Sequence, residues 1–182
     1  PPHFPLIVPE RWERFDLHSL EVRDNFIGGD DMRKHLATYY AMIENLDCNI
    51  GRLMETLGGG KGFEDVLTVY FSDHGDYMGS HGRFNTKEHC HEESVRIPAI
   101  FHRPGHIPAR GVIDDGMFSL VDLLATTLGL IDEPAPRWSQ GTDFAPAITG
   151  EGSFSAPEDV LLEMQGSPRW NLGMPDWRGL VN

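Results

Sequence analysis

The sequence has few cysteines, few basic residues and no long apolar run, and each shortage argues against a class of protein. Cys48 and Cys90 are the only cysteines, too few for a disulfide framework, and the sequence leaves open whether they are bridged. Lys and Arg number 15 against 28 Asp and Glu, and the net charge of −13 argues against a nucleic-acid binder, which needs a basic face. No apolar run approaches the roughly 18 residues that cross a bilayer, so no transmembrane segment is expected.

The chain also lacks an initiator Met and a signal segment, since it begins Pro1-Pro2-His3-Phe4-Pro5. We therefore expect a piece of a longer protein, in which any targeting information would lie upstream. The sequence leaves the cellular compartment open.

The composition that is present is typical of a globular protein rich in loops. Hydrophobic residues make up 40% and charged residues 24%, and a chain of this length buries roughly 70% of its unfolded surface. The 20 glycines and 13 prolines indicate that turns and irregular segments are frequent. Loops of this kind are where binding and catalytic residues usually lie.

Local patterns predict two helices and three strands. Apolar residues recur every three or four positions from Asp30-Asp31 to Gly58-Gly59-Gly60, a spacing that predicts a helix between them. Ser119 and Asp122 have the pattern of a capping box, and Gly129 is placed to end that second helix. Strands are predicted from the β-branched and aromatic composition of residues 66–71, 97–102 and 160–164.

Helices and strands alternate along the chain, which predicts an α/β layered fold with a mainly parallel sheet and flanking helices. The run 66–71 lacks a clean alternation of apolar and polar residues. Such a run is expected for a strand that is buried on both faces of a parallel sheet.

Six of the nine histidines lie between residues 74 and 106, and the densest part follows the first predicted strand. Ligands bind at the carboxyl ends of strands in open α/β sheets, which is where Asp73 and His74 are expected. A carboxylate oxygen and an imidazole nitrogen are both ligands for a divalent cation. Taken alone, this segment favours the alternative of a turn capped by Ser72 or Asp73, with His74 partly exposed.

Other polar groups nearby have simple structural interpretations. The run His89-Cys90-His91 is compatible with a zinc site that includes His81, but the spacing lacks the paired ligands of most zinc sites. Lys87 alone is typical of a solvated surface lysine. Within Glu92–Arg96 an acidic residue precedes Arg96 by three positions, which indicates a structural ion pair between the two side chains. Cys48 is expected to pack as a small apolar residue on its helix.

Several segments also occur together in a particular order. They are Pro2-His3-Phe4-Pro5-Leu6, the helix Tyr40–Leu57 with Leu46-Asp47 and Ile50-Gly51-Arg52-Leu53, FSDHGDYMGSHG from Phe71 to Gly82, Lys87, EESVRIP from Glu92 to Pro98, Val121-Asp122-Leu123-Leu124, Gly129 and Gly141. The joint pattern resembles the sulfatase family of the alkaline phosphatase superfamily over about residues 1–150. By this resemblance, residues 1–150 are the C-terminal half of a catalytic α/β domain, and residues 151–182 are the start of a small C-terminal subdomain or tail.

The resemblance implies hydrolysis of a sulfate monoester, of a small molecule or a carbohydrate, at a calcium-dependent site. Asp73 and His74 would be two ligands of Ca²⁺ or another divalent cation, with His74 standing where many relatives have Asn. Lys87 would contact the sulfate oxygens, and His3 would bind the sulfate or protonate the leaving group. His81 would lie near the substrate pocket. Fixed cations and donors suit this chemistry, because sulfuryl transfer places charge on the ester oxygens.

The chain departs from the family pattern at the nucleophile. The family uses a formylglycine made from the first residue of a C/S-x-P-S-R motif, and neither Cys48, Cys90 nor any serine begins such a motif here. The paired aspartates that complete the metal shell are also absent. We therefore expect half of an active site, with the N-terminal half of the domain missing, and no activity from the chain alone. The alternatives are a phosphonate or phosphate ester hydrolase of the same superfamily and a non-catalytic metal-binding fragment.

Overall fold

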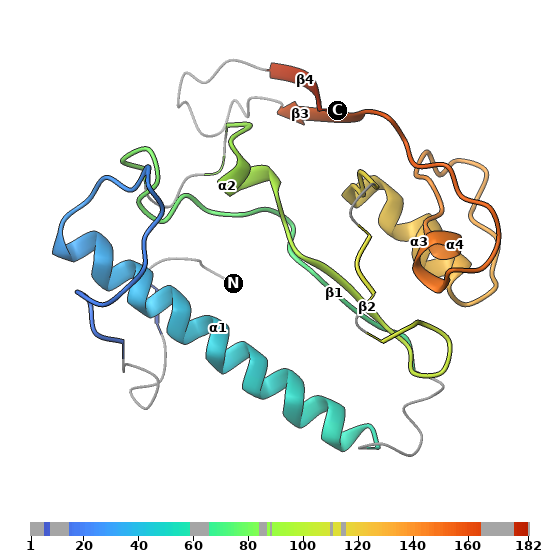
Figure 1. The fold of residues 1–182 in the computed structure, drawn as a ribbon, viewed down its shortest axis with the longest axis horizontal. Helices are drawn as coiled ribbons and strands as arrows, with labels where there is room; N and C mark the ends of the chain where they lie inside the picture. The colour runs from blue at the N-terminus through green and yellow to red at the C-terminus, as the bar shows by residue number, and fades with distance from the viewer. Residues whose placement is uncertain are drawn as a thin grey trace. The chain divides into compact units, whose positions relative to one another are not determined.

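A computed structural model describes residues 6–7, 15–58, 66–83, 87, 89–109, 111–113, 116–164 and 177–181. In chain order these form α1 (Asp30–Thr56), β1 (Thr68–Phe71), α2 (Glu92–Val95), β2 (Ala99–His102), the 3₁₀ helix η3 (Leu120–Asp122), α3 (Leu123–Gly129), α4 (Ala145–Thr149), β3 (Val160–Met164) and β4 (Trp177–Val181) (Figure 1). Among these helices none combines the length and the apolar character that crossing a membrane requires.

The chain divides into two compact units. Unit 1 comprises Pro1–Gly59, His74–Lys87 and His91–Arg96. Unit 2 comprises Gly60–Asp73, Glu88–Cys90 and Ile97–Asn182. α1 and α2 therefore belong to unit 1, and the four described strands belong to unit 2 with η3, α3 and α4. The domain boundary predicted after residue 150 stays a prediction.

α1 confirms the first predicted helix. Asp30 and Asp31 lie in its first turn, where carboxylates interact favourably with the unpaired N–H groups of the helix end. Arg33 fastens the preceding segment to the helix. Its guanidinium lies 5.5 Å from the centroid of the Phe26 ring and donates a hydrogen bond to the carbonyl of Leu17 (3.2 Å).

The segment before α1 also pairs with a turn within residues 77–83. The Ile27 N–H donates to the Gly79 carbonyl, and the His81 N–H donates to the Asn25 carbonyl, both at 2.9 Å. Gly79 has a φ of +98°, and a side chain there would collide with the Phe26 ring, so glycine is required. This pairing fixes the turn that carries His81, one of the predicted site residues.

β1 and β2 pair antiparallel, with Thr68 opposite His102. The strands predicted within 66–71 and 97–102 are confirmed, but the mainly parallel sheet is not, because the two sheets among the described residues are each two-stranded and antiparallel. A parallel pair needs a crossover of about a dozen residues or more, usually a helix. The connection from residue 72 to residue 98 is long enough for such a crossover, yet β2 returns antiparallel to β1, so the pairing direction is set by the tertiary structure and not by the length of the connection.

The expectation that the first strand is buried on both faces is wrong for the described residues. Phe71 in β1 is 42% exposed, and the other three residues of β1 are half-buried. An apolar run shows that a strand is suited to burial, whereas the actual burial depends on which tertiary partners cover its faces.

The predicted capping box is present where η3 leads into α3. The Ser119 backbone N–H donates to Asp122 Oδ2 (2.8 Å), and α3 ends at Gly129 as predicted. The carboxylate of Asp122 also accepts a hydrogen bond from the Thr142 N–H through Oδ1 (2.7 Å). One buried carboxylate therefore starts the helix and ties the segment before α4 to it.

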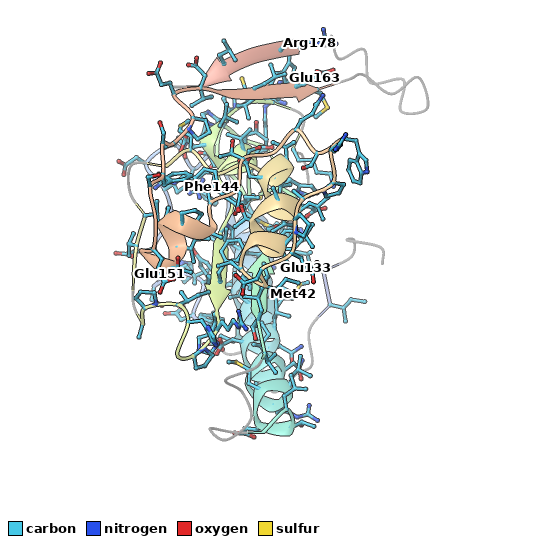
Figure 2. All side chains as sticks on the ribbon, turned by 90° about the vertical axis from the view of Figure 1, so that its right-hand side faces the viewer. Met42, Glu133, Phe144, Glu151, Glu163 and Arg178 are labelled. Carbon is cyan, nitrogen blue, oxygen red and sulfur yellow. The ribbon has the colours of Figure 1, made fainter. Side chains whose placement is uncertain are left out.

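Aromatic side chains form the core of unit 2 around α3 and α4, which lie side by side in Figure 1. Phe144, labelled in Figure 2, is 1% exposed. Its ring centroid lies 5.2 Å from that of Phe118 and 4.8 Å from that of Phe154. Phe118 in turn lies edge-on to Phe101 of β2 at 5.6 Å. These contacts join β2 to the helical part of the unit.

Gly141 is expected to tolerate no side chain, because a Cβ there would collide with the backbone of Val121 and Asp122. Gly141→Ala should lower the free energy of unfolding by about 1–3 kcal/mol, the usual cost of overpacking. Gly51→Ala is the matched control, since Gly51 lies inside α1 with open space around it, and this change should stabilise the helix by up to about 1 kcal/mol. Urea unfolding followed by circular dichroism measures both variants. Equal midpoints would contradict the close approach at Gly141.

β3 matches the strand predicted over 160–164 and pairs antiparallel with β4. Glu163 and Arg178 lie opposite each other and form an ion pair of 3.1 Å across the two strands (Figure 2). β4 was not predicted, because its sequence contains Gly179 and shows no alternation that would indicate a strand.

Both cysteines are free and exposed. The expectation that Cys48 packs as an apolar residue is wrong, because its position on α1 faces solvent.

Candidate active site

His74 and Lys87, two of the predicted site residues, are in direct contact within unit 1. Lys87 Nζ lies 2.9 Å from His74 Nε2, and His74 Nδ1 lies 2.9 Å from the carbonyl oxygen of Gly75. An ammonium group only donates hydrogen bonds and a carbonyl oxygen only accepts them, so Nε2 is the acceptor and Nδ1 carries the hydrogen. The imidazole therefore has one defined tautomer, with its unprotonated nitrogen facing a cation.

α2 holds both members of this pair through Ser94. The Gly75 N–H donates to the Ser94 carbonyl (2.8 Å), and Ser94 Oγ donates to the Lys87 carbonyl (2.7 Å). Gly75 is required because a Cβ at this position would collide with the carbonyl oxygen of Glu93. The short helix thus sets the spacing between His74 and Lys87.

Glu93, the preceding residue on α2, is a buried carboxylate whose side chain is 6% exposed. Oε1 accepts a hydrogen bond from Asn25 Nδ2 (2.7 Å) and lies 3.4 Å from Arg23 Nη1, while Oε2 lies 3.5 Å from His81 Nε2. Burial raises the pKa of Glu93, but the hydrogen bonds from Asn25 and from its own backbone, with the charges of His81 and Arg23, outweigh burial and lower the pKa to about 2. The group is therefore ionised at neutral pH.

His81 is held by aromatic neighbours as well. Its ring stacks on His91 with centroids 4.3 Å apart and lies edge-on to Tyr77 at 5.9 Å. The hydroxyl of Tyr77 bonds to His91 Nδ1 (2.9 Å), which fixes the ring that supports the stack. His81 has a φ of +56°, a conformation that a non-glycine residue adopts only where its surroundings stabilise it.

The zinc alternative gains no support from this geometry. Stacked rings of His81 and His91 do not aim their nitrogens at a common point. In the part of the chain that the structure describes, no three His, Cys, Asp or Glu side chains are grouped so as to hold a metal ion.

The structure bears on the predicted site residues to different extents. The structure brings His74 and Lys87 together and ties His81 to α2 through Glu93. Asp73 is exposed and directly precedes His74 in the sequence. His3 lies outside the described residues, so its role stays a prediction.

Sequence analysis missed Asn25 and Ser94 and predicted the ion pair of Arg96 with the wrong one of the two glutamates of α2. Arg96 pairs with Glu92, four residues away, at 3.7 Å on the exposed side of the helix, whereas Glu93 turns inward. Adjacent helical residues point about 100° apart, so Glu92 and Glu93 face different surroundings. Asn25 has no local signal, because 68 positions separate it from Glu93 in the sequence.

Known proteins resemble this chain in sequence and in fold. The sequence profile of the Sulfatase family matches residues 2–133. The chain belongs to the sulfatase family. This sulfatase chain is 29% identical over 134 residues to a choline-sulfatase of Rhizobium meliloti, a match that covers 74% of the chain and 25% of that relative. It is 34% identical over 125 residues to an N-acetylglucosamine-6-O-sulfatase of Bacteroides thetaiotaomicron, covering 69% of the chain and 21% of that relative.

A solved structure holding its substrate D-glucosamine-2-N,6-O-disulfate is 27% identical to the sulfatase chain, with a TM-score of 0.68 over 79% of this chain and 30% of that one. The two curated relatives are named as sulfatases, which are hydrolases, and the similarity to solved sulfatase structures is consistent with the α/β class predicted here. The sulfatase chain spans between 25% and 31% of the length of the first two curated relatives it matches.

Proposed function

We propose that the protein to which this chain belongs hydrolyses sulfate monoesters, with Lys87 and His74 beside the reacting group. The observation that carries the proposal is the 2.9 Å contact between Lys87 Nζ and His74 Nε2, supported by α2 through Ser94. Sulfuryl transfer places negative charge on the non-bridging and leaving oxygens. A positively charged group whose position is set before the reaction stabilises that charge without further reorganisation.

Each remaining site residue has a proposed role. Lys87 contacts the sulfate oxygens as a hydrogen-bond donor, and His81 contributes to binding the substrate. His3 binds the sulfate or protonates the leaving oxygen. The substrate class is a sulfate ester of a small alcohol or a sugar, which is the class that the names of the relatives describe.

Asp73 and His74 are proposed as two ligands of Ca²⁺ or another divalent cation. The Nδ1–H of His74 is bound to a backbone carbonyl, as is usual for a metal-ligating imidazole, which leaves Nε2 as the ligating atom. Nε2 now accepts from Lys87 Nζ at 2.9 Å, so Lys87 must move off this nitrogen when a cation binds. Ca²⁺ takes about six to eight ligands, so these two residues leave most of its coordination to other groups. A bound cation would polarise an oxygen of the ester.

The isolated chain is expected to hydrolyse no sulfate ester at a measurable rate. It contains no C/S-x-P-S-R motif from which a formylglycine nucleophile is made, and loss of a nucleophile costs on the order of a million-fold in turnover. Release of nitrophenol from nitrophenyl sulfate measures the rate. Turnover by the chain alone that matched turnover by the full-length protein would contradict this prediction.

The proposed function is tested on the protein encoded by the complete reading frame. Its kcat/KM is measured on an aryl sulfate, a glucosamine sulfate and an aryl phosphonate under the same conditions. A clear preference for either sulfate ester supports the proposal. Preference for the phosphonate would replace it with a phosphonate or phosphate ester hydrolase, and inactivity on all three would favour a non-catalytic metal-binding protein.

A further inference from the structure

Three polar side chains from separate segments of unit 1 converge on one another. Asn25 precedes α1, His81 lies in the turn that pairs with it, and Glu93 lies on α2. Asn25 Nδ2 lies 2.7 Å from Glu93 Oε1 and 3.1 Å from His81 Nε2. The proposed function leaves Asn25 and Glu93 without a role.

The chemistry of these contacts decides where the hydrogen of the imidazole lies. A carboxylate only accepts hydrogen bonds, so the nitrogen of the Asn25 amide must be the atom that faces Glu93. That nitrogen has a second hydrogen and lies 3.1 Å from His81 Nε2, and an amide nitrogen donates but does not accept, so we assign this hydrogen to the contact with Nε2. In the neutral ring Nε2 therefore accepts, and Nδ1 carries the hydrogen. Protonation of the ring would add a hydrogen at Nε2, which lies 3.5 Å from Glu93 Oε2, and would leave Nδ1–H in place.

The ring of His81 is also held in one orientation. It stacks on His91, its backbone N–H donates to the Asn25 carbonyl (2.9 Å), and its own φ is positive. Within the described ranges no group forms a hydrogen bond with Nδ1, and the side chain is 38% exposed. The structure therefore combines an immobile ring with one available N–H donor.

We propose that Asn25 and Glu93 are positioning residues that hold His81 in the Nδ1–H form, so that its ring presents a fixed donor to an oxygen of the sulfate ester. The substrate contact rests on the proposed function, whereas the form of the ring does not. Asn25 acts through His81 and does not itself touch the substrate.

The form of the ring is measured by nitrogen NMR of the full chain with labelled histidine, at a pH where imidazoles are neutral. Long-range proton–nitrogen spectra distinguish a protonated from an unprotonated ring nitrogen, and a His81→Phe variant assigns the signals. We expect a protonated Nδ1 and an unprotonated Nε2 for His81. The opposite pattern would overturn the proposal.

Two variants separate positioning from folding. Asn25→Asp places a carboxyl oxygen beside both Glu93 Oε1 and His81 Nε2. One of the two carboxyl groups must then hold a proton, and the new oxygen is left as an acceptor beside Nε2, which is expected to move the imidazole hydrogen to that nitrogen. Asn25→Ala should release the ring to a mixture of both forms. His74 is the internal control, because Gly75 and Lys87 fix its form independently of Asn25. If the NMR pattern of His81 stays the same in both variants, as that of His74 should, Asn25 does not determine the form of the His81 ring.

The substrate contact is tested with the full-length enzyme. Asn25→Asp is expected to raise KM for a sulfate ester roughly tenfold, the effect of one lost hydrogen bond, with a smaller change in kcat. An unchanged KM would overturn the contact with the ester. If the full-length protein hydrolyses no sulfate ester while the NMR pattern is as expected, the proposed function and the contact fail, and the assignment of the ring stands.

Discussion

Replacing Lys87 with Ala is expected to lower the kcat of the full-length protein on a sulfate ester about 100- to 1,000-fold, the loss seen when one preorganised donor to a developing oxyanion is removed. The ammonium of Lys87 is fixed by its 2.9 Å contact with His74 and by the Ser94 hydroxyl on its own carbonyl. KM should change less, because the charge that Lys87 stabilises grows in the transition state. Steady-state kinetics on an aryl sulfate measures both constants.

Lys34→Ala is the matched control for this substitution. Lys34 lies on α1, its side chain is 62% exposed, and it contacts Asp31 at 3.3 Å, so its removal should leave both constants unchanged. Lys87→Arg should restore little activity, since a planar guanidinium cannot take the place of a compact ammonium in this contact. Equal kcat values for the Lys87→Ala and Lys34→Ala proteins would show that Lys87 does not act on the ester.

Replacing Glu93 with Ala is expected to lower the free energy of unfolding of the chain by about 2–3 kcal/mol, the range for hydrogen bonds to charged groups together with loss of a buried side chain. The substitution leaves Asn25 without its acceptor and removes the carboxylate that lies beside Arg23 and His81. Glu92→Ala is the matched control on the same helix. Its side chain is 73% exposed, and loss of its pair with Arg96 should cost no more than about 0.5 kcal/mol.

Urea unfolding followed by far-ultraviolet circular dichroism, which reports on α1, compares the two variants. Similar midpoints for Glu93→Ala and Glu92→Ala would mean that the buried contacts of Glu93 contribute nothing to stability.

Glu93 should also make the free energy of unfolding depend on pH in the acid range. Its pKa in the folded chain is about 2, below the usual value of 4.5, so the folded form binds this proton less readily than the unfolded form. Its contribution is therefore complete above about pH 4.5 and is lost as the pH falls toward 2. The Glu93→Gln chain should lose less stability across this window than the wild type. Parallel curves of midpoint against pH for the two proteins would contradict the prediction.

Short-range patterns in this sequence were enough to predict much of the secondary structure. The apolar spacing after Asp30 identifies α1, and the Ser119 and Asp122 pair identifies the capping box, because both depend on residues within a few positions of each other. The contact between His74 and Lys87 is compatible with the family pattern, which places both residues at the site.

The direction of strand pairing could not be read from the same patterns. An apolar run is equally suited to a parallel or an antiparallel neighbour, and the choice between them depends on the tertiary structure. β1 and β2 are antiparallel although the connection from residue 72 to residue 98 is long enough for either arrangement.

By itself, the sequence determined α1, the capped start of α3 and the resemblance to sulfatases with the candidate residues that it names, since each follows from local spacing or from an ordered set of motifs. Only the tertiary structure decided that α2 organises unit 1, with Ser94 holding Gly75 and Lys87 and with Glu93 holding Asn25 and His81. The physical reason is that a buried carboxylate must be hydrogen-bonded or paired with a charge, and its partners can lie in any segment that the fold brings close to it. Here one of those partners lies 68 residues away, at a distance where no periodicity connects them.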